Sequence, residues 1–398
     1  MRVLFAAVSV TSHLLPMVPL AGALRAAGHE VLLVGQPDLL PEAEAAGFVT
    51  AAVGSEQLEA ERRRKMAQVA KQQATVPGGT WQPTWDQLAA RWRERVNGVL
   101  DDYLEIGRWW RPDLIVTDPL EFSARILGGA LGVPVVVHRW GPETMSTEAA
   151  EPARRALADT CARFGVPDGL GDPALVVDPC PPGLQFPAAA PARAVRHVPF
   201  NGAGSVPRWA RQDTGGRRRV CVSLGSMPAH LGGLSLLRTL ASAVAGLDRV
   251  EAVVPLAPEL REQIGELPDC VRVVDPVPLH LFLDGCTAVL HHGGSGTALT
   301  AIAHGLPQLV LPQFNPALAM CGERVAATGV GLNLAAESRP DAPAITTALR
   351  ALLDDPGPRT RAEAVRRDMA RQPTPAALVP DLESLAADGA PRSAASSR

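Results

Sequence analysis

Residues 287–300, with the sequence TAVLHHGGSGTALT, decide the fold, because they join an apolar run, a glycine-rich turn and an apolar helix start. The run TAVL is typical of a strand buried on both faces of a parallel sheet. N–H groups at a helix start lack intrahelical partners and carry the positive end of the helix dipole. Glycines let the backbone approach a ligand closely. We therefore predict a strand, a turn and a helix that together bind a diphosphate.

Side chains in the same turn add donors to those of the backbone. The hydroxyls of Ser295 and Thr297 and the ring of His292 can all donate hydrogen bonds. A tight turn without a ligand is the alternative, but two histidines before the glycines favour phosphate. The predicted phosphate-binding set is His292, Gly293, Gly294, Ser295, Gly296 and Thr297.

Other phosphate and metal motifs do not fit this turn. No strand followed by an acidic residue appears about 20 residues on, as a dinucleotide site requires. No lysine follows the glycines, which excludes a Walker loop. Adjacent His291 and His292 point to opposite faces of an extended segment, so we expect them to share no ion. We predict no metal site.

Strands and helices alternate on both sides of a Pro- and Gly-rich stretch at 178–218. This alternation predicts an α/β fold with parallel sheets in two domains. We expect the first domain at 1–205, a linker at 206–218, the second domain at 219–375, a helix at 376–388 and a disordered tail at 389–398. Expected strands of the second domain include those near 219–224, 250–255, 271–274, 287–290 and 308–311.

Composition limits the class of protein. The 398 residues are 46% hydrophobic, which is enough for two packed cores. The net charge of −3 argues against a nucleic-acid partner and against an anionic membrane surface. We expect no signal peptide, because the sequence starts directly with a predicted strand, and we expect no run long enough to span a bilayer. The six scattered cysteines, without a C-x-x-C pair, are expected as reduced thiols in the cytoplasm.

Two polar residues follow strands of the first domain. His13 lies just past the strand at 2–8, in a polar loop expected at 9–15, and Asp118 lies just past the strand at 113–117. The carboxyl edge of an open α/β sheet is where ligands bind. A neutral imidazole there can act as a base, and an Asp that accepts the ring N–H fixes its tautomer. A surface histidine and an Asp at a helix start are the alternatives.

These motifs together resemble the GT1-type glycosyltransferases of GT-B fold, nearest to actinomycete enzymes that attach deoxysugars to polyketide antibiotics and macrolides. The resemblance covers nearly the whole chain. It is carried by residues 12–20, 27–31, 137–141, 178–182, 277–279, 291–297 and 305–313. It implies two Rossmann-like domains with parallel sheets facing across a cleft, and a tail helix from Ala376 that crosses back to the first domain.

The resemblance also implies roles for single residues. His13 matches the catalytic base and Asp118 its orienting acid. Val277 matches the position whose backbone pairs with the nucleotide base, and Gly225-Ser226 matches a turn beside the phosphates. The tryptophans at 81, 85 and 92 flank a Gly-rich stretch, where they either begin an amphipathic helix or line a pocket for a flat ligand. We predict Trp81, Trp85 and Trp140 as acceptor-binding residues.

Two positions depart from the family pattern. Thr300 stands where many relatives have a Glu that binds both ribose hydroxyls, which favours a thymidine diphosphate (TDP) donor with its 2′-deoxyribose. The usual Asp-Gln pair that contacts sugar hydroxyls is missing from 312–317. Gln313 and Asn315 are its predicted stand-ins, and the sugar is expected either to lack some hydroxyls or to be held by other groups.

The resemblance predicts an inverting, metal-independent glycosyltransferase. Its substrates would be a TDP-deoxysugar and a hydroxyl of a polyketide or macrolide-like aglycone in antibiotic biosynthesis. No cofactor is implied beyond the nucleotide-diphospho-sugar co-substrate, and two copies of the chain could form a homodimer. An inactive auxiliary partner and a GT-B-fold sugar-nucleotide epimerase are the alternatives.

Overall fold

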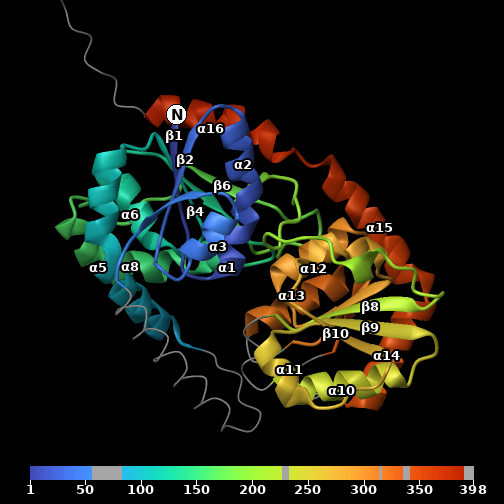
Figure 1. Cartoon of the computed structure of the whole chain (residues 1–398). Helices are drawn as coiled ribbons and strands as arrows, with labels where there is room; N and C mark the ends of the chain where they lie inside the picture. Colours follow the sequence, from blue (N-terminus) through green and yellow to red (C-terminus); the bar gives the residue numbers. More distant parts are fainter. Residues whose placement is uncertain (56–82, 226–232, 313–315, 335–340, 390–398) are drawn as a thin grey trace, which may run out of the picture.

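The chain folds into two α/β lobes, each built around its own parallel sheet (Figure 1). The computed structural model describes residues 1–55, 83–225, 233–312, 316–334 and 341–389. The two sheets and their helices confirm the predicted α/β fold with two Rossmann-like domains. The predicted domain limits themselves stay predictions, and residues 390–398 of the expected tail lie outside the described residues.

The sheet of the first lobe has seven parallel strands in the order β3-β2-β1-β4-β5-β6-β7. The order reverses between β1 and β4, which are neighbours in space although 111 residues separate paired Ala6 and Thr117 along the chain. Short apolar runs form the central strands because both of their faces are covered. The strands are β1 (Arg2–Ala6), β2 (Glu30–Gly35), β3 (Val49–Ala52), β4 (Leu114–Thr117), β5 (Val135–His138), β6 (Leu175–Asp178) and β7 (Arg193–Ala194).

Helices cover both faces of this sheet. One core forms where α5, α6 and α8 pack on it, and a second forms on the opposite face with α2, α3 and the C-terminal helix α16. The longest, α5, begins with a capping box between Thr84 and Gln87. The helices before the second lobe are α1 (Thr11–Leu14), α2 (Val18–Ala26), α3 (Leu40–Ala45), α5 (Trp85–Trp110), α6 (Phe122–Leu131), α7 (Met145–Glu148) and α8 (Ala150–Arg163), with 3₁₀ turns η1 (Leu15–Met17) and η2 (Arg208–Arg211).

The sheet of the second lobe has six parallel strands in the order β10-β9-β8-β11-β12-β13. Here the order reverses between β8 and β11, which repeats the arrangement of the first lobe. The strands expected from the sequence between 219 and 311 all occur, with ends that shift by about one residue. They are β8 (Arg218–Ser223), β9 (Val250–Pro255), β10 (Val271–Val274), β11 (Ala288–His291), β12 (Gln308–Val310) and β13 (Gly331–Asn333).

The helices of the second lobe pack on its sheet and form the cores of this lobe. Among them α12 follows β11 directly, as the sequence predicts. The elements are α10 (Gly233–Ala245), α11 (Pro258–Ile264), η3 (Leu279–Leu281), η4 (Leu283–Gly285), α12 (Ser295–Ala303), α13 (Pro316–Ala327), α14 (Ala342–Asp354), α15 (Pro356–Arg371) and α16 (Pro375–Gly389).

Two segments tie the lobes together. Helix α16 leaves the second lobe and lies beside α2 of the first, where Leu378 and Leu382 join its core (Figure 1). In the opposite direction, Cys180 and Leu184 follow β6 and pack into a cluster with α12, α13 and α15. The Gln372 side chain donates to the Cys180 carbonyl at 2.7 Å. Each lobe therefore contributes side chains to a core of the other.

One local expectation needs correction. The segment 9–15 is not simply a loop, because residues 11–14 form the helical turn α1, which continues through η1 into α2. Pro16 fits this path because it lies at the first turn of a helix, where its missing N–H is not needed. None of the helices in the described ranges is long and apolar enough to cross a membrane.

Candidate active site

The first half of the site lies where β1 and β4 end side by side. Ala6 of β1 pairs with Thr117 of β4, so the segments that follow both strands leave the same edge of the sheet. His13 lies on α1 after the first strand, and Asp118 follows the second directly. The predicted proximity of these two residues is therefore found, on a helical turn rather than in a loop.

His13 and Asp118 form a hydrogen-bonded pair. His13 Nδ1 lies 3.2 Å from Oδ1 of Asp118, which is fully buried, while the His13 side chain stays 14% exposed. The N–H groups of Val8 and Leu120 donate to the same carboxylate at 2.7 and 2.8 Å. Burial alone raises the pKa of Asp118, but the His13 hydrogen bond and charge, together with these N–H groups, hold it below its ordinary value. Asp118 is therefore an anion.

The anionic Asp118 fixes the tautomer of His13. A carboxylate can only accept, so the Nδ1 atom of His13 carries the ring proton and donates it. In the neutral imidazole, Nε2 then holds a lone pair that can accept a proton. The cap of α6 is a different residue, Glu121, whose carboxylate accepts from Ser123 N at 3.1 Å. The alternative reading of Asp118 as a helix cap is therefore wrong.

Trp140 lies against the ring of His13. The two ring centroids are 3.9 Å apart, and the planes are inclined by only 25°. Trp140 lies in the segment that follows β5. The residue before it, Arg139, is 1% exposed. The sequence predicts Trp140 as an acceptor-binding residue. The structure brings it onto His13, a contact that the sequence does not reveal.

The second half of the site lies where β8 and β11 end side by side. Ser223 of β8 pairs with His291 of β11, so Gly225 and His292 leave the same edge. The two histidines face different surroundings, as predicted. His291 is fully buried, and its Nδ1 accepts from Gly293 N at 3.1 Å while Nε2 donates to Gln308 Oε1 at 2.9 Å. Burial lowers the pKa of His291 to about 3, so this neutral ring braces the turn.

His292 is held by a backbone carbonyl. Its Nδ1 lies 3.2 Å from Ser223 O, and since a carbonyl only accepts, Nδ1 must donate. Nε2 therefore becomes a donor to phosphate only when the ring is protonated, a condition that the sequence does not show. Burial lowers the pKa of His292. The ring lies so close to Gly225 and Gly294 that a Cβ atom at either would approach it to 2.6 and 2.8 Å.

The start of α12 is open to a ligand. Its N-cap is Gly294, no side chain caps the helix, and its first turn has no acidic residue. Gly293 adopts φ +100, and a Cβ there would lie 2.3 Å from Leu318 O, so only glycine fits. Of the predicted phosphate-binding set, Ser295, Gly296 and Thr297 form this uncapped helix start, whereas the Gly293 amide donates to His291.

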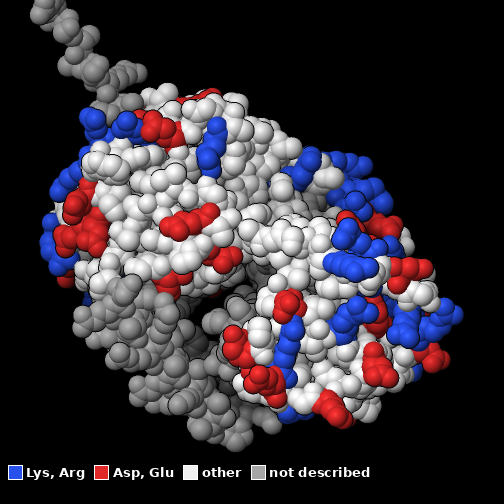
Figure 2. All heavy atoms as spheres, in the orientation of Figure 1, with Lys and Arg blue, Asp and Glu red and all other residues white. Residues whose placement is uncertain are grey.

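The two halves of the site touch each other. Gly141 follows Trp140 and has φ +151, and a Cβ at this position would lie 2.6 Å from Cβ of Ser295. Gly141 belongs to the first lobe, and Ser295 begins α12 in the second. The loop that carries Trp140 therefore packs directly against the predicted diphosphate site. Figure 2 shows the surface hollowed between the two lobes, with acidic and basic side chains interspersed on the face in view.

A residue that the sequence does not single out lies beside Thr300. Thr300 is fully buried, and its hydroxyl donates to Gly296 O at 2.7 Å. The side-chain amide of Asn201 donates to the same hydroxyl at 3.1 Å, and Asn201 Oδ1 accepts from His280 N at 3.1 Å. Asn201 thus joins the first lobe's trailing segment to α12 and to the turn after Val277. No local motif surrounds it, so only the tertiary contacts identify it.

The two tryptophans of α5 that the sequence analysis considers have different surroundings. Trp85 begins α5 and is 37% exposed, whereas Trp92 is 4% exposed and meets Phe122 edge-on at a centroid distance of 5.1 Å. Trp92 therefore belongs to the core of the first lobe and not to a ligand pocket. Other predicted residues lie outside the described part of the chain, namely Trp81, Ser226, Gln313 and Asn315.

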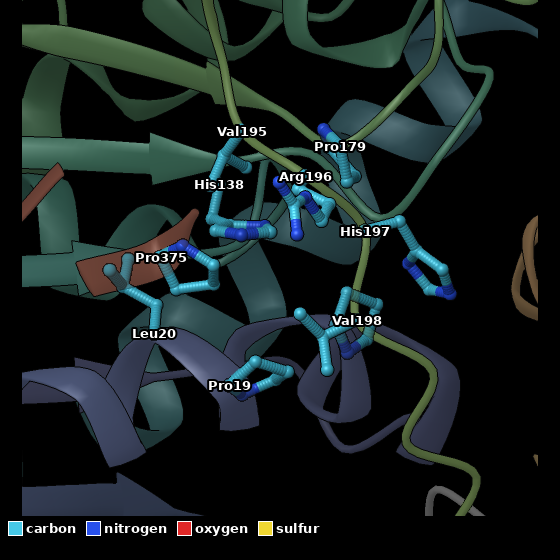
Figure 3. A pocket seen from close by; sticks show the side chains of 10 residues that line it. Pro19, Leu20, His138, Pro179, Val195, Arg196, His197, Val198 and Pro375 are labelled. Atoms are coloured by element: carbon cyan, nitrogen blue, oxygen red, sulfur yellow. The ribbon is translucent and has the colours of Figure 1, made fainter. Parts of the chain in front are cut away.

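A small cavity lies where the start of α2, the end of β5, residues 195–198 and the start of α16 meet (Figure 3). Its volume of about 10 Å³ holds one water molecule, far too little for a sugar or an aglycone. His138 and His197 line it, and burial lowers their pKa values to about 4 and about 3. The cavity is therefore separate from substrate binding.

Within the described ranges, no group of three or more His, Cys, Asp or Glu residues could hold a metal ion. The described cysteines are all free, and burial raises the pKa of the Cys221 and Cys180 thiols. The chemistry available at the site is thus that of an imidazole with an orienting carboxylate, opposite an anion-binding helix start.

Comparison with known proteins agrees with this geometry. The family models described as Erythromycin biosynthesis protein CIII-like, N-terminal and C-terminal domains, match residues 22–225 and 238–385. The chain is 31% identical to aclacinomycin-T 2-deoxy-L-fucose transferase of Streptomyces galilaeus, covering 98% of this chain and 97% of the relative. It is 32% identical to 10-deoxymethynolide desosaminyltransferase of Streptomyces venezuelae, covering 97% of each.

Solved structures extend the comparison to the fold. The spinosyn rhamnosyltransferase SpnG, complexed with thymidine diphosphate, is 37% identical, with a TM-score of 0.82 over 96% of this chain and 100% of that one. The same enzyme is also known in complex with spinosyn aglycone, with the same identity, coverage and TM-score. Both lobes match in sequence and in fold, and the chain therefore belongs to the erythromycin biosynthesis protein CIII-like family of GT-B glycosyltransferases.

Proposed function

We propose that this glycosyltransferase moves a deoxysugar from a TDP-sugar to a hydroxyl of a polyketide or macrolide-like aglycone in antibiotic biosynthesis, with inversion at the anomeric carbon. The single observation that carries the mechanism is the buried, anionic Asp118 bonded at 3.2 Å to a partly exposed His13. The relatives are named as a 2-deoxy-L-fucose transferase and a 10-deoxymethynolide desosaminyltransferase, and these names support the substrate class.

The reaction follows from the protons that these residues hold. His13 Nδ1–H donates to Asp118, so Nε2 takes the proton of the acceptor hydroxyl as its oxygen attacks the anomeric carbon. The bond from that carbon to the diphosphate oxygen breaks, and TDP leaves with the electron pair. The proton stays on His13, and the Asp118 carboxylate stabilises the resulting imidazolium, as in a protease triad. Attack from the face opposite the leaving group inverts the configuration.

The leaving diphosphate needs compensation for its developing charge. The uncapped start of α12 offers amide dipoles, with Ser295 and Thr297 hydroxyls nearby. Donors that are already oriented stabilise developing charge without reorganisation, which is commonly a large part of catalysis. These groups make a metal ion unnecessary, and we propose that the reaction needs neither a metal nor a cofactor beyond the sugar nucleotide.

The thymidine preference rests on Thr300 and its surroundings. The Thr300 hydroxyl is engaged by Gly296 and Asn201, and no carboxylate of α12 is available there for two ribose hydroxyls. A 2′-deoxyribose needs one acceptor fewer and fits this position better. Val277 remains the proposed backbone partner of the nucleotide base. Gln313 and Asn315 remain the proposed contacts to the sugar.

The experiment that tests this function is a donor and acceptor screen. Purified protein is incubated with TDP- and UDP-linked sugars, each with a panel of polyketide and macrolide aglycones, and free nucleotide and glycoside are measured. We expect glycoside with TDP-sugars and far less with the matched UDP-sugars. Release of neither nucleotide with any pair, although the protein binds TDP, would favour an inactive auxiliary partner. The most active donor and aglycone in this screen are the assay pair below.

Two further proposals concern the cellular context. We propose a cytoplasmic location, which the reduced cysteines support, since all those described are free. We also propose that two copies of the chain form a homodimer. Sedimentation of the purified chain tests the dimer, and a monomer at all concentrations would contradict it.

A further inference from the structure

Trp140 has a geometry that binding of an acceptor alone does not explain. Its indole lies nearly parallel to the His13 imidazole at 3.9 Å, which is the distance of ring stacking. His13 is held at its edge by Asp118 and at one face by Trp140. A single hydrogen bond fixes the direction of Nδ1 but leaves the ring free to swing about that bond. A flat surface against one face removes this freedom.

The backbone on both sides of Trp140 is anchored. Before it, the fully buried Arg139 guanidinium donates to Asp178 Oδ2 at 2.8 Å, to Ser146 Oγ at 2.9 Å and to Ala190 O at 2.7 Å. A guanidinium with three directed hydrogen bonds has a fixed orientation. The indole is therefore positioned from a rigid support.

After Trp140, the chain is fixed by a second set of contacts. The carbonyl of Gly141 accepts from Gln185 Nε2 at 3.3 Å, and the same amide donates to Asp178 Oδ2 at 2.9 Å. Gly141 also packs on Ser295 at the start of α12. The strip from Arg139 to Gly141 thus connects the base to the diphosphate-binding helix through packed groups.

We infer that Trp140 is a positioning residue for the general base: its indole holds the His13 ring in the orientation for proton transfer and stabilises the imidazolium that forms in the reaction. The electron-rich face of an indole attracts a cation that lies over it, so the interaction strengthens as His13 gains its proton. An interaction that is stronger after proton transfer than before it lowers the barrier. This inference rests on the proposed function of His13 as base.

The stacking can be measured without substrate. An indole over an imidazole shifts the ring proton signals of His13 in the NMR spectrum of histidine-labelled protein, and a His13→Gln variant assigns those signals. We expect the Trp140→Leu variant to lose this shift and the Trp140→Phe variant to keep part of it. Identical His13 signals in wild type and Trp140→Leu would overturn the inference.

The catalytic consequence is tested by a double-mutant cycle with the assay pair. We expect Trp140→Leu to lower kcat about tenfold, a loss that remains at saturating aglycone, and Trp140→Phe to restore most of kcat. Residues that act as a unit are not additive, so Trp140→Leu should have no further effect in the His13→Ala background.

Two outcomes would contradict the inference in distinguishable ways. If Trp140→Leu lowers kcat by the same factor with and without His13, Trp140 acts independently of the base, and the inference fails while the proposed function stands. If His13→Ala turns over at the wild-type rate, the base assignment fails first. Unchanged TDP affinity by calorimetry in each variant shows that the donor lobe remains folded.

Discussion

The two lobes place their functional residues at the same topological position but use it differently. In the first lobe β1 and β4 end together, and in the second β8 and β11 do, each pair marking the point where strand order reverses. Ligands bind at such points in open α/β sheets. The first lobe fills the position with side chains that already have partners, such as His13 and Asp118. The second leaves backbone amides of α12 uncapped.

This difference follows from the two tasks. A general base must keep its own ring proton on one nitrogen so that the other nitrogen is free to accept a proton. A hydrogen bond to a buried carboxylate achieves that. A diphosphate is a large, delocalised anion, and an open helix start accommodates it mainly through backbone amides. We therefore expect changes in the first lobe to affect turnover and changes in the second to affect nucleotide affinity. Four predictions test this separation, from the largest expected effect to the smallest.

The largest effect is expected from His13→Ala. Removal of a positioned general base should lower kcat by about 10²–10⁴-fold. Because His13 belongs to the first lobe, the affinity for TDP should stay within about twofold of wild type, which calorimetry measures. Steady-state kinetics with the assay pair give kcat. A variant that loses TDP affinity along with turnover would break the separation between the lobes.

A stability difference is expected between buried and exposed arginines of the first lobe. Arg139→Met leaves Asp178 and Glu143 without their buried cation and should destabilise the lobe by about 3–5 kcal/mol. Arg155→Met is the matched control, because that pair with Glu151 is on the surface and contributes about 0–1 kcal/mol. Urea unfolding measures both. Equal unfolding midpoints for the two variants would show that the Arg139 guanidinium does not stabilise the segment that carries Trp140.

A smaller effect is expected from Gly225→Ala in the donor lobe. The new Cβ would lie 2.6 Å from the His292 ring, at a residue with φ +71, so the ring must move. We expect TDP affinity to fall about tenfold, the equivalent of one charge-assisted hydrogen bond. Gly215→Ala is the control, since Gly215 has a similar φ of +63 with nothing within 4 Å. Similar losses in both variants would mean that backbone strain alone is responsible.

The smallest effect is a pH dependence of TDP binding. Burial lowers the pKa of His292, and its Nδ1–H is used by Ser223, so the free site is neutral above that pKa. A hydrogen bond from Nε2 to the diphosphate requires a second ring proton, so binding takes up a proton. Affinity should then fall as pH rises, by less than about tenfold over one pH unit, which is the interval compared. His292→Gln should have a flatter dependence, and equal slopes would exclude this protonation.

Much of this comparison could be predicted from the sequence, because it depends on local order. A strand followed by a glycine turn and a helix identifies the residues from Ala288 to Thr297, and alternation along an extended segment separates His291 from His292. His13 and Asp118 follow strands that become neighbours, which strand order in a doubly wound sheet makes probable but does not guarantee.

What the sequence could not show depends on contacts between distant segments. The stacking of Trp140 on His13, the contact of Gly141 with Ser295 and the bonds of Asn201 to α12 all require the tertiary arrangement of the lobes. Short-range signals also mislead in places. The turn α1 lacks a strong N-cap and was not predicted as helix, and Trp92 is a core residue although its neighbours suggest a pocket.

The most direct test of the division between the lobes is a calorimetric titration of TDP into His13→Ala beside wild type. The prediction is saturable binding at one site, with the same affinity in both proteins, because the diphosphate is held by the α12 start and not by the base. Absence of binding heat with TDP and with every other nucleoside diphosphate, both alone and with aglycone present, would contradict this account of the site.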